Sequence, residues 1–397
     1  NGMITVLTFL LGALAFLVSV PVLVLLGQVL LAYLPARAQP AAAWTRPQVA
    51  VLVPAHDEAS IIGATLASLV PQLQAGDRLL VVADNCSDDT ARRAEEGGAE
   101  VIVRQDALRR GKGYALDFGM RHLAADPRQV VIIVDADCRA EEGALEQLAR
   151  RCAQSGRPVQ ALYLMKAPAG AGLKVQVAEF AWRVKNLVRP RGWARVGLPC
   201  QLMGSGMAFP WQDLAAVDLA NGHLVEDVKL GLDLCQRGTP PLFCPQALVT
   251  SQFPTSEQGL NSQRTRWEHG HLGLMLADAP RRAWAAVRQR NLALAGLTLD
   301  VLVPPLALLV LMLLGLNALT WLAYAVAGIA IPAWMALSAL LLLALAVLLA
   351  WARFCRDVIP FSVLLYAPFY ALRKVPVYVG FLIKRQVEWV RSRREED

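Results

Sequence analysis

The sequence predicts an α/β domain with a mostly parallel sheet and helices on both faces, plus transmembrane helices at both ends of the chain. Strand-length apolar runs alternate with helix-length segments between residues 45 and 290, which is typical of parallel sheets with right-handed crossovers. Apolar stretches that can cross a bilayer lie on either side, in residues 1–36 and 297–351. The composition agrees, because 55% of the 397 residues are hydrophobic, more than a soluble chain usually contains.

The net charge of +7 lies largely beside the apolar segments. There it suits positive-inside flanks and anionic lipid better than nucleic acid. The sequence has no aromatic-rich RNA motif and no zinc-finger spacing, so we expect no nucleic-acid partner. The seven cysteines are odd in number and contain no Cys-x-x-Cys pair, which argues against a disulfide framework and a zinc cage. They indicate a reducing, cytosolic compartment for most of the chain.

The first element, residues 3–34, is apolar and free of charge. A cleaved signal peptide is the alternative, with residues 36–38 as a loose cleavage site, but the stretch is far longer than the usual 7–15 or so apolar residues. Positive charges follow it at Arg37 and Arg46. We therefore expect residues 1–36 to form an anchor whose N-terminus is outside and whose C-terminal end is in the cytosol.

The region 45–290 alternates strand and helix patterns in chain order. Strands are expected at Val49–Pro54, Leu79–Asp84, Val101–Val103, Val130–Val134 and Val159–Leu164, and helices at Ile61–Val70, Asp88–Glu96, Lys112–Leu123, Glu141–Cys152 and Val175–Val188. Residues 189–195 are basic and aromatic and are expected to form a loop. That loop would lie on the membrane surface, beside an acceptor cleft or simply on the protein surface.

The run Val130–Val134 contains five β-branched apolar residues and no polar face, as in a strand buried on both sides. It ends in Asp135-Ala136-Asp137, and ligands of open α/β sheets lie beyond the carboxyl ends of the strands. Two carboxylates there repel each other unless a cation is near. Magnesium takes one or two carboxylates and leaves room for phosphate oxygens. The pair therefore indicates a divalent-metal site that holds a diphosphate; the alternative is an acidic turn.

Polar residues also follow the first two strands, at His56-Asp57-Glu58 and at Asp84. Three polar strand ends on one edge indicate a nucleotide site. Asp84 suits hydrogen bonds from a base or ribose, although residues 84–90 are also rich in helix-capping side chains.

Lys112 lies between glycines in residues 109–113, where a strand passes into a helix. Glycines let the backbone approach phosphate, and the lysine supplies positive charge near a helix start. The spacing is not that of a P-loop, and a solvated basic loop is an equal alternative.

Two later segments offer catalytic groups. Glu226-Asp227 opens a helix pattern, where one carboxylate suffices for capping and the second can serve as a general base. On a helix Gln263, Arg266 and Trp267 share a face. They offer an amide, a guanidinium that matches phosphate and a ring that stacks on sugar. An amphipathic surface helix is the alternative.

Two further spans are expected within residues 297–351, the first leading out and the second back. Arg353 and Arg356 then fall on the cytosolic side. Residues 356–386 are apolar but interrupted by prolines and by Arg373-Lys374, which favours interfacial or re-entrant helices. Residues 387–397 are expected to form a charged cytosolic tail.

Asp84, Asp135-Ala136-Asp137, Glu226-Asp227 and the Gln-Arg-Thr-Arg-Trp of residues 263–267 form a D, DxD, ED, QxxRW pattern. The pattern closely resembles that of the membrane-embedded family 2 glycosyltransferases, in the cellulose-synthase-like and exopolysaccharide-synthase branch. The resemblance covers about residues 45–290. It implies a GT-A-type, Rossmann-like fold and an inverting, metal-dependent hexosyltransferase that uses a nucleotide sugar, with UDP the expected carrier.

The resemblance also implies a role for each site residue. Asp135 and Asp137 would hold Mg²⁺ or Mn²⁺ on the donor diphosphate, Asp227 would deprotonate the acceptor, and Arg266 would neutralise the leaving diphosphate. Glu226 and Trp267 would contact the acceptor. The implied donor-binding positions are Pro54, His56, Glu58, Asp84, Lys112, Asp135, Gln263 and Arg266.

The sequence departs from the cellulose synthases in two places: Val225 stands where Thr is usual, and no FxVT-type gating-loop motif follows residue 267. Processive synthesis and addition of one sugar are therefore comparable alternatives, with a glycan or polyprenyl-linked glycan as acceptor. The expected setting is bacterial exopolysaccharide or cell-surface polysaccharide synthesis at the inner membrane. The lipid bilayer is a partner, and a homo-oligomer is left open. The alternative class is a nucleotide-binding transporter or scaffold, which the scarcity of ionisable groups in the spans disfavours.

Overall fold

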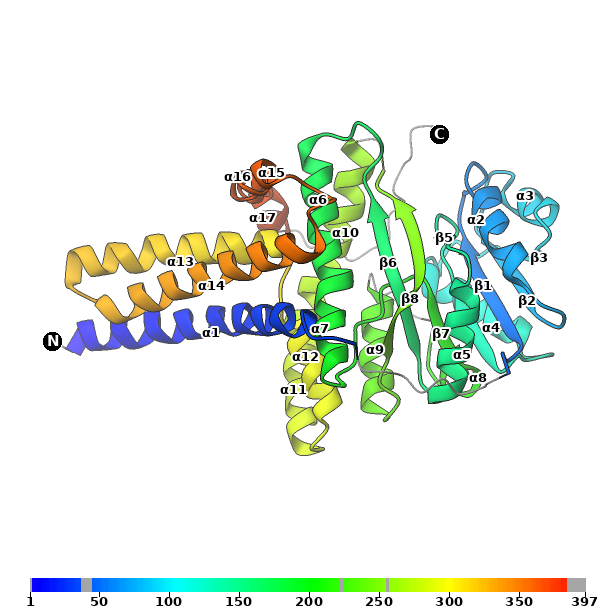
Figure 1. Ribbon diagram of the computed structural model, residues 1–397, viewed down its shortest axis with the longest axis horizontal. Helices are drawn as coiled ribbons and strands as arrows, with labels where there is room; N and C mark the ends of the chain where they lie inside the picture. The colour runs from blue at the N-terminus through cyan, green and yellow to red at the C-terminus, as the bar shows by residue number, and fades with distance from the viewer. Residues whose placement is uncertain (1, 37–44, 221–224, 255–256, 384–397) are drawn as a thin grey trace.

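The computed structural model describes residues 2–36, 45–220, 225–254 and 257–383, and Figure 1 shows an α/β domain joined to a bundle of long helices. The predicted tail at 387–397, the neighbouring residues 384–386, and Arg37 fall outside these ranges.

The described strands form one eight-stranded sheet in the order β3-β2-β1-β4-β7-β6-β8-β5. The four strands from β3 to β4 are parallel to their neighbours, and β6 is parallel to β8. Strand β7 is antiparallel to both β4 and β6, and β5 is antiparallel to β8. The strands are β1 Val49–Ala55, β2 Arg78–Asp84, β3 Glu100–Arg104, β4 Val130–Ile133, β5 Arg139–Ala140, β6 Val159–Lys166, β7 Met207–Pro210 and β8 Leu242–Gln252. The predicted mostly parallel α/β fold is confirmed.

Helices cover both faces of this sheet because successive side chains of a strand point to opposite sides. In β1, Val49, Val51 and Val53 pack with α2 (Ile62–Leu69) and α5 (Ala144–Ser155). Ala50 and Leu52 pack instead with α4 (Lys112–Leu123). Both sides of β1 and β4 are buried, which leaves the ends of these strands as the exposed positions for chemistry.

The α/β domain and its junction with the bundle contain further helices. They are α3 Thr90–Glu96, α6 Leu173–Arg183, α7 Arg189–Arg195, α8 Trp211–Ala215, α9 Glu226–Gln236, α10 Glu257–Ala277, α11 Ala279–Arg288 and α12 Leu292–Val301, with a 3-10 turn at Val70–Gln72 and a π-helical turn at Val184–Val188. The π turn joins α6 to α7 in one continuous helical path.

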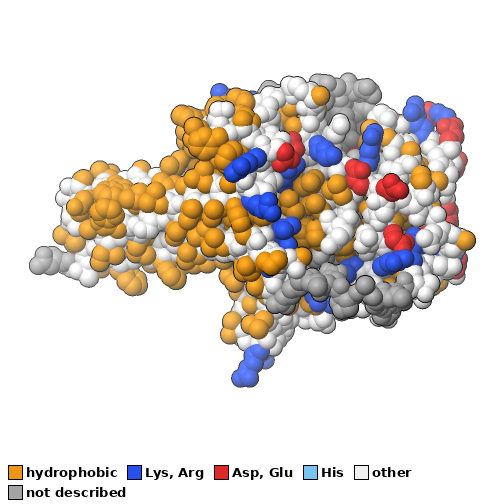
Figure 2. All heavy atoms as spheres, viewed as in Figure 1, with side chains coloured by type: hydrophobic (Ala, Val, Ile, Leu, Met, Phe, Trp, Pro, Cys, Tyr) orange, Lys and Arg blue, Asp and Glu red, His pale blue; other side chains and the backbone are white. Residues whose placement is uncertain are grey.

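Three helices are long and apolar enough to cross a membrane: α1 Gly2–Ala32, α13 Leu306–Ala327 and α14 Ala330–Phe354. Figure 2 shows hydrophobic side chains along the outside of this bundle and charged side chains over the α/β domain. The second candidate span begins at Leu306 rather than Leu297, because Pro304-Pro305 separates α12 from α13. The predicted interfacial segment contains only short helices: α15 Phe361–Leu364, α16 Ala367–Leu372 and α17 Val375–Ile383.

A buried polar network joins the bundle to the domain. Asp300 of α12 accepts hydrogen bonds from Arg189 (Nη2–Oδ1 2.7 Å) and Gln28 of α1 (2.6 Å), and its other oxygen accepts from Gln201 (2.8 Å). All four side chains are buried. The network therefore fixes α1, α7 and α12 against one another through one carboxylate.

The prediction of a loop at residues 189–195 is wrong, because these residues form α7. Pro190 lies in the first turn of α7, directly after the π-helical turn, so its missing N–H falls where the helical hydrogen-bonding pattern changes. Gly192 lets α7 approach α1 closely, since a Cβ there would lie 2.0 Å from the Gln28 carbonyl oxygen. Arg189 and Trp193 are buried and bond to Asp300 and to the Gly296 carbonyl of α12, whereas Arg191 donates to the Ala32 carbonyl at the end of α1. The basic and aromatic residues of the segment therefore hold α7 against α12 and α1.

Candidate active site

The acidic pair lies where β4 ends. Asp135, Asp137 and Cys138 each offer a ligand atom, and these atoms lie within 4.8 Å of one another. Burial raises the pKa of the Cys138 thiol well above its usual value, so the thiol stays protonated and the two half-buried carboxylates are the ligands on offer. The Asp135 N–H donates to Ser205 Oγ (3.0 Å) and the Ala136 carbonyl accepts from Thr65 Oγ1 (2.6 Å). The turn that presents the pair is therefore held from both sides.

Lys112 neutralises part of this charge. Its Nζ lies 2.5 Å from Asp135 Oδ1 and donates to the Gly204 carbonyl (2.6 Å). Burial acts to lower the pKa of Lys112, but the carboxylates of Asp135, Glu226 and Asp227 outweigh it and raise the pKa above the ordinary value. The ammonium thus stays charged and gathers three carboxylates from β4 and α9.

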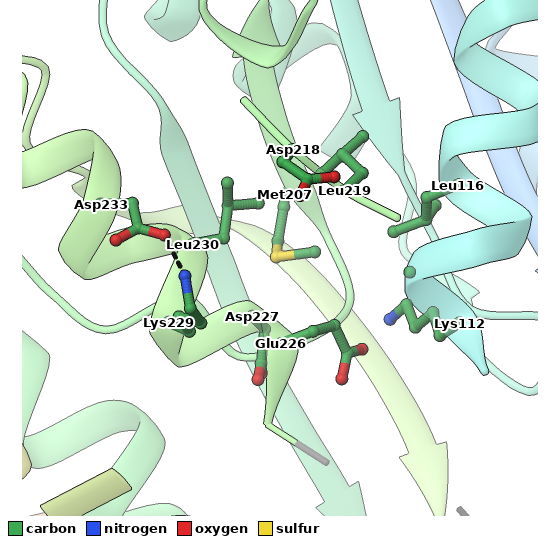
Figure 3. Close-up of a pocket in the computed structure, with 11 residues that line it drawn as sticks. Lys112, Leu116, Met207, Asp218, Leu219, Glu226, Asp227, Lys229, Leu230 and Asp233 are labelled. Atoms are coloured by element: carbon green, nitrogen blue, oxygen red, sulfur yellow. Dashed lines mark hydrogen bonds and ion pairs between the residues drawn. The ribbon is translucent and has the colours of Figure 1, made fainter. Parts of the chain in front are cut away.

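Glu226 and Asp227 lie in the first turn of α9, beside Lys112 (Figure 3). A Cβ on Gly204 would lie 3.4 Å from Asp227 Oδ2, 3.7 Å from Lys112 Nζ and 3.8 Å from Asp135 Oδ2. Gly204 has a positive φ of 91° and leaves the space between these groups open. Asp227 and Asp135 therefore lie near one another around Gly204.

Burial shifts the titration of the α9 carboxylates. It raises the pKa of Glu226 to about 7, although the charge of Lys112 opposes the shift. It also raises the pKa of Asp227, against the charges of Lys112 and Lys185. A carboxylate with a raised pKa is a stronger base than a solvated one, which suits proton abstraction from a hydroxyl.

A small cavity of about 20 Å³ lies between α4 and α9, behind the carboxylates. Its volume suits one water molecule. Figure 3 shows Lys112 and Glu226 at its edge, and Met207, Leu116 and Leu230 form its apolar wall. This cavity is too small for a sugar.

Helix α10 brings the third group of residues. Burial lowers the pKa of Arg266, and the carboxylates of Glu226, Asp137 and Asp135 act against this, which places its guanidinium near both acidic groups. Gln263, one turn earlier, is buried, and its Oε1 has no hydrogen-bond partner among the described residues. Trp267 packs against Trp182 of α6, with ring centroids 5.0 Å apart and the ring planes tilted by 40°. Arg264 points elsewhere and donates to Tyr370 Oη (2.8 Å).

The ends of β1 and β2 meet at the same edge of the sheet. His56 Nδ1 lies 2.7 Å from the Asp84 carbonyl oxygen, and the Glu58 N–H donates to Thr90 Oγ1 (2.8 Å). Pro54 pairs with Val82 in the parallel ladder just before this contact. All of the predicted donor-binding positions at strand ends therefore lie on one rim with the acidic pair of β4.

Asp84 is held more tightly than the sequence indicates. It is buried, and its Oδ1 lies 2.6 Å from Arg104 Nη1 and accepts from Asn85 Nδ2 (3.0 Å). Arg104 in turn lies over the Tyr114 ring, 5.6 Å from its centroid. These partners fix the carboxylate at the rim, so only its second oxygen can take a hydrogen bond from a ligand.

Sequence reasoning missed four residues of this site: Trp182, Lys185, Gly204 and Ser205. Trp182 forms an aromatic pair with Trp267, and its Nε1 donates to the Tyr163 carbonyl (3.1 Å). Lys185 lies over the Trp182 ring at 5.6 Å, within the π-helical turn. Such turns often mark functional sites, but no residue pattern announces them. The two glycines of Gly204-Ser205-Gly206 indicate a permissive backbone, but nothing in the sequence indicates what this segment approaches.

Comparison with known proteins agrees with this geometry. The probable glycosyltransferase YdaM of Bacillus subtilis (strain 168) is 29% identical over 258 residues, which are 58% of this chain and 56% of YdaM. Glucosyl-3-phosphoglycerate synthase of Mycolicibacterium paratuberculosis is 39% identical over 95 residues, which are 22% of this chain and 28% of that enzyme. The chain thus spans about half or less of the length of these curated relatives.

Among solved structures, the mannosyltransferase PcManGT from Pyrobaculum calidifontis, in complex with GDP-Man and Mn²⁺, has a similar fold. The TM-score is 0.58 at 17% identity, over 95% of this chain and 100% of that one. The family model of glycosyltransferase-like family 2 matches residues 47–270, which is more than half of the chain and includes the acidic pair, the α9 carboxylates and the α10 motif. The chain therefore belongs to the glycosyltransferase-like family 2.

Proposed function

We propose that the chain is an inverting, metal-dependent membrane glycosyltransferase that moves a hexose from a nucleotide sugar to a glycan or polyprenyl-linked glycan. The single observation that carries the proposal is the convergence at Gly204. An oxygen of Asp227 in α9 and an oxygen of Asp135 at the end of β4 both lie within 4 Å of the position that a Cβ on Gly204 would take. The carboxylates of Glu226, Asp135 and Asp137 also act on the pKa of Arg266. An inverting displacement needs a base on one side of the reacting carbon and groups that stabilise the leaving diphosphate on the other. Asp227 is the proposed base, and Asp135, Asp137 and Arg266 are the proposed stabilising groups.

The residues at the end of β4 fit a divalent cation. Asp135 and Asp137 present hard oxygen ligands within 4.8 Å of one another, and Mg²⁺ or Mn²⁺ prefers such ligands. When bound, the cation supplies positive charge to the departing diphosphate. PcManGT, of similar fold, was solved with GDP-Man and Mn²⁺, which supports a metal of this class.

We assign a separate role in the transfer reaction to each of five residues. Asp227 takes the proton from the acceptor hydroxyl, and its raised pKa favours this. Arg266, held near Asp135 and Asp137, stabilises charge on the leaving oxygens. The paired rings of Trp267 and Trp182 offer an apolar surface for the acceptor ring. Glu226 lies beside the base and orients the acceptor.

The donor rests on the rim formed by the ends of β1, β2 and β4. We propose that Pro54, His56, Glu58 and the free oxygen of Asp84 surround the nucleoside. A UDP-linked sugar is the favoured donor from the family resemblance, and a GDP-linked sugar is the alternative, because PcManGT binds GDP-Man. Lys112 and Gln263 lie nearer the diphosphate.

We place the enzyme in the bacterial inner membrane, in exopolysaccharide or cell-surface polysaccharide synthesis. The three apolar helices support a multi-pass topology. With the N-terminus outside, the positive charges at Arg353 and Arg356 and the α/β domain lie in the cytosol, where nucleotide sugars are made.

The test is release of nucleoside diphosphate by the purified full chain, incubated with a panel of UDP- and GDP-sugars, Mn²⁺ and membrane extract as acceptor source. Asp227→Asn should lower turnover by about 10²–10⁴-fold, the usual contribution of a general base, and leave donor binding intact. Asp117→Asn, at a surface pair with Arg121, is the matched control. Donor binding without turnover under every acceptor condition would instead support a nucleotide-binding scaffold.

A further inference from the structure

The α11–α12 hairpin, residues 279–301, has one face buried and one face exposed. Ala279, Ala286, Leu294 and Leu297 pack with α9 in one apolar cluster. The opposite face exposes Trp284 (63%), Val287 (80%) and Leu292 (80%). Large apolar side chains gathered in this way are costly in water, so this face is suited to an apolar partner.

The exposed face also carries positive charge. Arg281, Arg288 and Arg290 are exposed beside the apolar side chains, and Arg288 lies over the Trp284 ring at 5.2 Å. The salt bridges of the described residues pair Arg282 with Asp233 and Asp278 but include none of these three. Arginine and tryptophan together on one face are typical of helices that lie in the headgroup layer of a membrane.

The hairpin also lies at the level where the headgroup layer would surround the three candidate membrane helices. Asp300, near the end of α12, contacts Gln28 of α1, four residues before α1 ends. The chain enters α13 five residues after α12 ends. Figure 1 shows α11 and α12 running across the direction of the long helices, at their root. The hairpin therefore extends sideways along the plane where a bilayer surface would lie.

In Figure 2 hydrophobic side chains cover the part of the hairpin nearest the membrane helices, and Lys or Arg side chains lie at its free end. The apolar surface is thus continuous with that of α1, and the charge lies at the edge, where lipid phosphates are found. A second protein copy would need carboxylates placed opposite the arginines. An anionic lipid surface offers negatively charged phosphates to the arginines at any orientation.

We propose that the α11–α12 hairpin is a lipid-binding paddle that inserts Trp284, Val287 and Leu292 into the headgroup layer and recruits anionic phospholipids through Arg281, Arg288 and Arg290. The partner is the lipid surface around the enzyme's own spans. This binding depends on the three apolar helices crossing the bilayer and not on glycosyl transfer.

The test places an environment-sensitive fluorophore (NBD) on Val287→Cys in the full chain, reconstituted in lipid nanodiscs. Lipids with a nitroxide on the acyl chain serve as quenchers, either phosphatidylcholine or phosphatidylglycerol at equal mole fraction. The same label on Arg121→Cys, on the exposed side of α4, is the matched control. The parent chain gives the background from its seven cysteines, of which only Cys86 is not buried.

We expect strong quenching at residue 287 and none at residue 121. Phosphatidylglycerol should quench more than phosphatidylcholine, with a local enrichment of about fivefold or more, since one arginine near an anionic surface contributes about that factor. The triple variant Arg281→Gln, Arg288→Gln and Arg290→Gln should lose the enrichment and keep the quenching by phosphatidylcholine.

Three results would overturn the proposal. Water-like emission without quenching means that the hairpin is solvated. Apolar emission without quenching by either lipid means that a second copy of the chain covers it. Equal quenching by the two lipids means that the arginines do not select anionic headgroups.

Discussion

Lys112 stands between acidic groups that come from distant parts of the chain. Its ammonium contacts Asp135 and the Gly204 carbonyl, and the charges of Glu226 and Asp227 also act on it. The protein therefore carries an internal cation at the place where the sequence predicts an external one. Without a metal ion, the lysine offsets part of the negative charge of these carboxylates. A bound divalent ion offsets more of it.

Removal of the Lys112 ammonium should destabilise the metal-free protein. In chelator, Lys112→Met should cost about 1–3 kcal/mol, because the half-buried Asp135 loses its ion-pair partner. Mn²⁺ should restore part of this loss, since it can replace the missing charge, and should change the parent chain less. Thermal unfolding in detergent measures both effects.

Lys229→Met is the control for this prediction, because Lys229 forms a partly exposed pair with Asp233 on the same cavity. It should cost about 1 kcal/mol or less and show no rescue by metal. Equal behaviour of the two variants would contradict a special role for Lys112.

Glu226 should make stability depend on pH. Burial raises its pKa from 4.5 to about 7, so the folded state holds the proton more tightly than the unfolded state. The stabilisation is complete below about pH 4.5 and is lost as the pH rises through about 7. In metal-free protein, the melting temperature of the parent relative to Glu226→Gln should therefore fall across this window. Parallel melting curves for the two proteins would refute the shift.

The residue roles that could be predicted from the sequence are those carried by local patterns. Asp135-Ala136-Asp137 follows its own strand, and Gln263, Arg266 and Trp267 share a helix face, so their chemistry is readable from spacing. Trp182 lies 85 positions before Trp267 in the sequence, and only the folded chain brings the rings to 5.0 Å. Such a contact has no local signal.

At the scale of elements, β1 to β4 were predicted because each has its own apolar run and ends in polar residues. β7 has only four residues, and β8 contains Pro245 opposite a register shift between Ala161 and Leu162. These strands depend on long-range pairing that no periodicity reveals. The Gly204-Ser205-Gly206 segment supplies the connection, since the Gly206 N–H donates to Ile133 O (2.9 Å) and its carbonyl accepts from Ala161 N (2.8 Å).

Gly206→Ala should break this connection. The φ of Gly206 is 67°, and a Cβ would lie 2.7 Å from the Ala161 Cβ and 2.8 Å from Val249 Cγ2. We expect a loss of roughly 2–4 kcal/mol from backbone strain and overpacking. Gly63→Ala, in α2 with open space around it, should instead stabilise by about 0.4–1 kcal/mol. Chemical unfolding of both variants in detergent tests the contrast.

At the scale of the whole molecule, the Asp300 network sets how the α/β domain sits on the membrane helices. The sequence showed Asp300 as one acidic residue near the start of an apolar region, with no indication that Arg189, Gln28 and Gln201 would meet it. Its partners come from three separate segments. One of them, Arg189, lies in the segment 189–195 that the sequence predicts to be a loop, so a buried ion pair is not expected there.

Asp300→Leu should destabilise the protein by about 3–5 kcal/mol, because it leaves Arg189 charged and buried without a partner. The double variant Arg189→Met with Asp300→Leu should recover much of this loss. Asp357→Asn, at the exposed pair with Arg183, should change the stability by about 0.5 kcal/mol or less. Additive losses in the double variant would show that the two side chains do not act as a pair.

The seam between α1, α13 and α14 has a consequence for the fate of the product. It is filled by buried alkyl side chains in one continuous cluster, among them Ala15, Val22, Leu313, Ala339 and Ala346. A hydrated glycan strand cannot thread between helices packed in this way. If these helices span the bilayer and the chain transfers sugar as proposed, the packed seam leaves no passage between them in the described part of one copy, and the lengthened acceptor stays in the compartment that supplied its sugar. Export then requires separate machinery, such as a flippase, or a ring of copies around a shared pore.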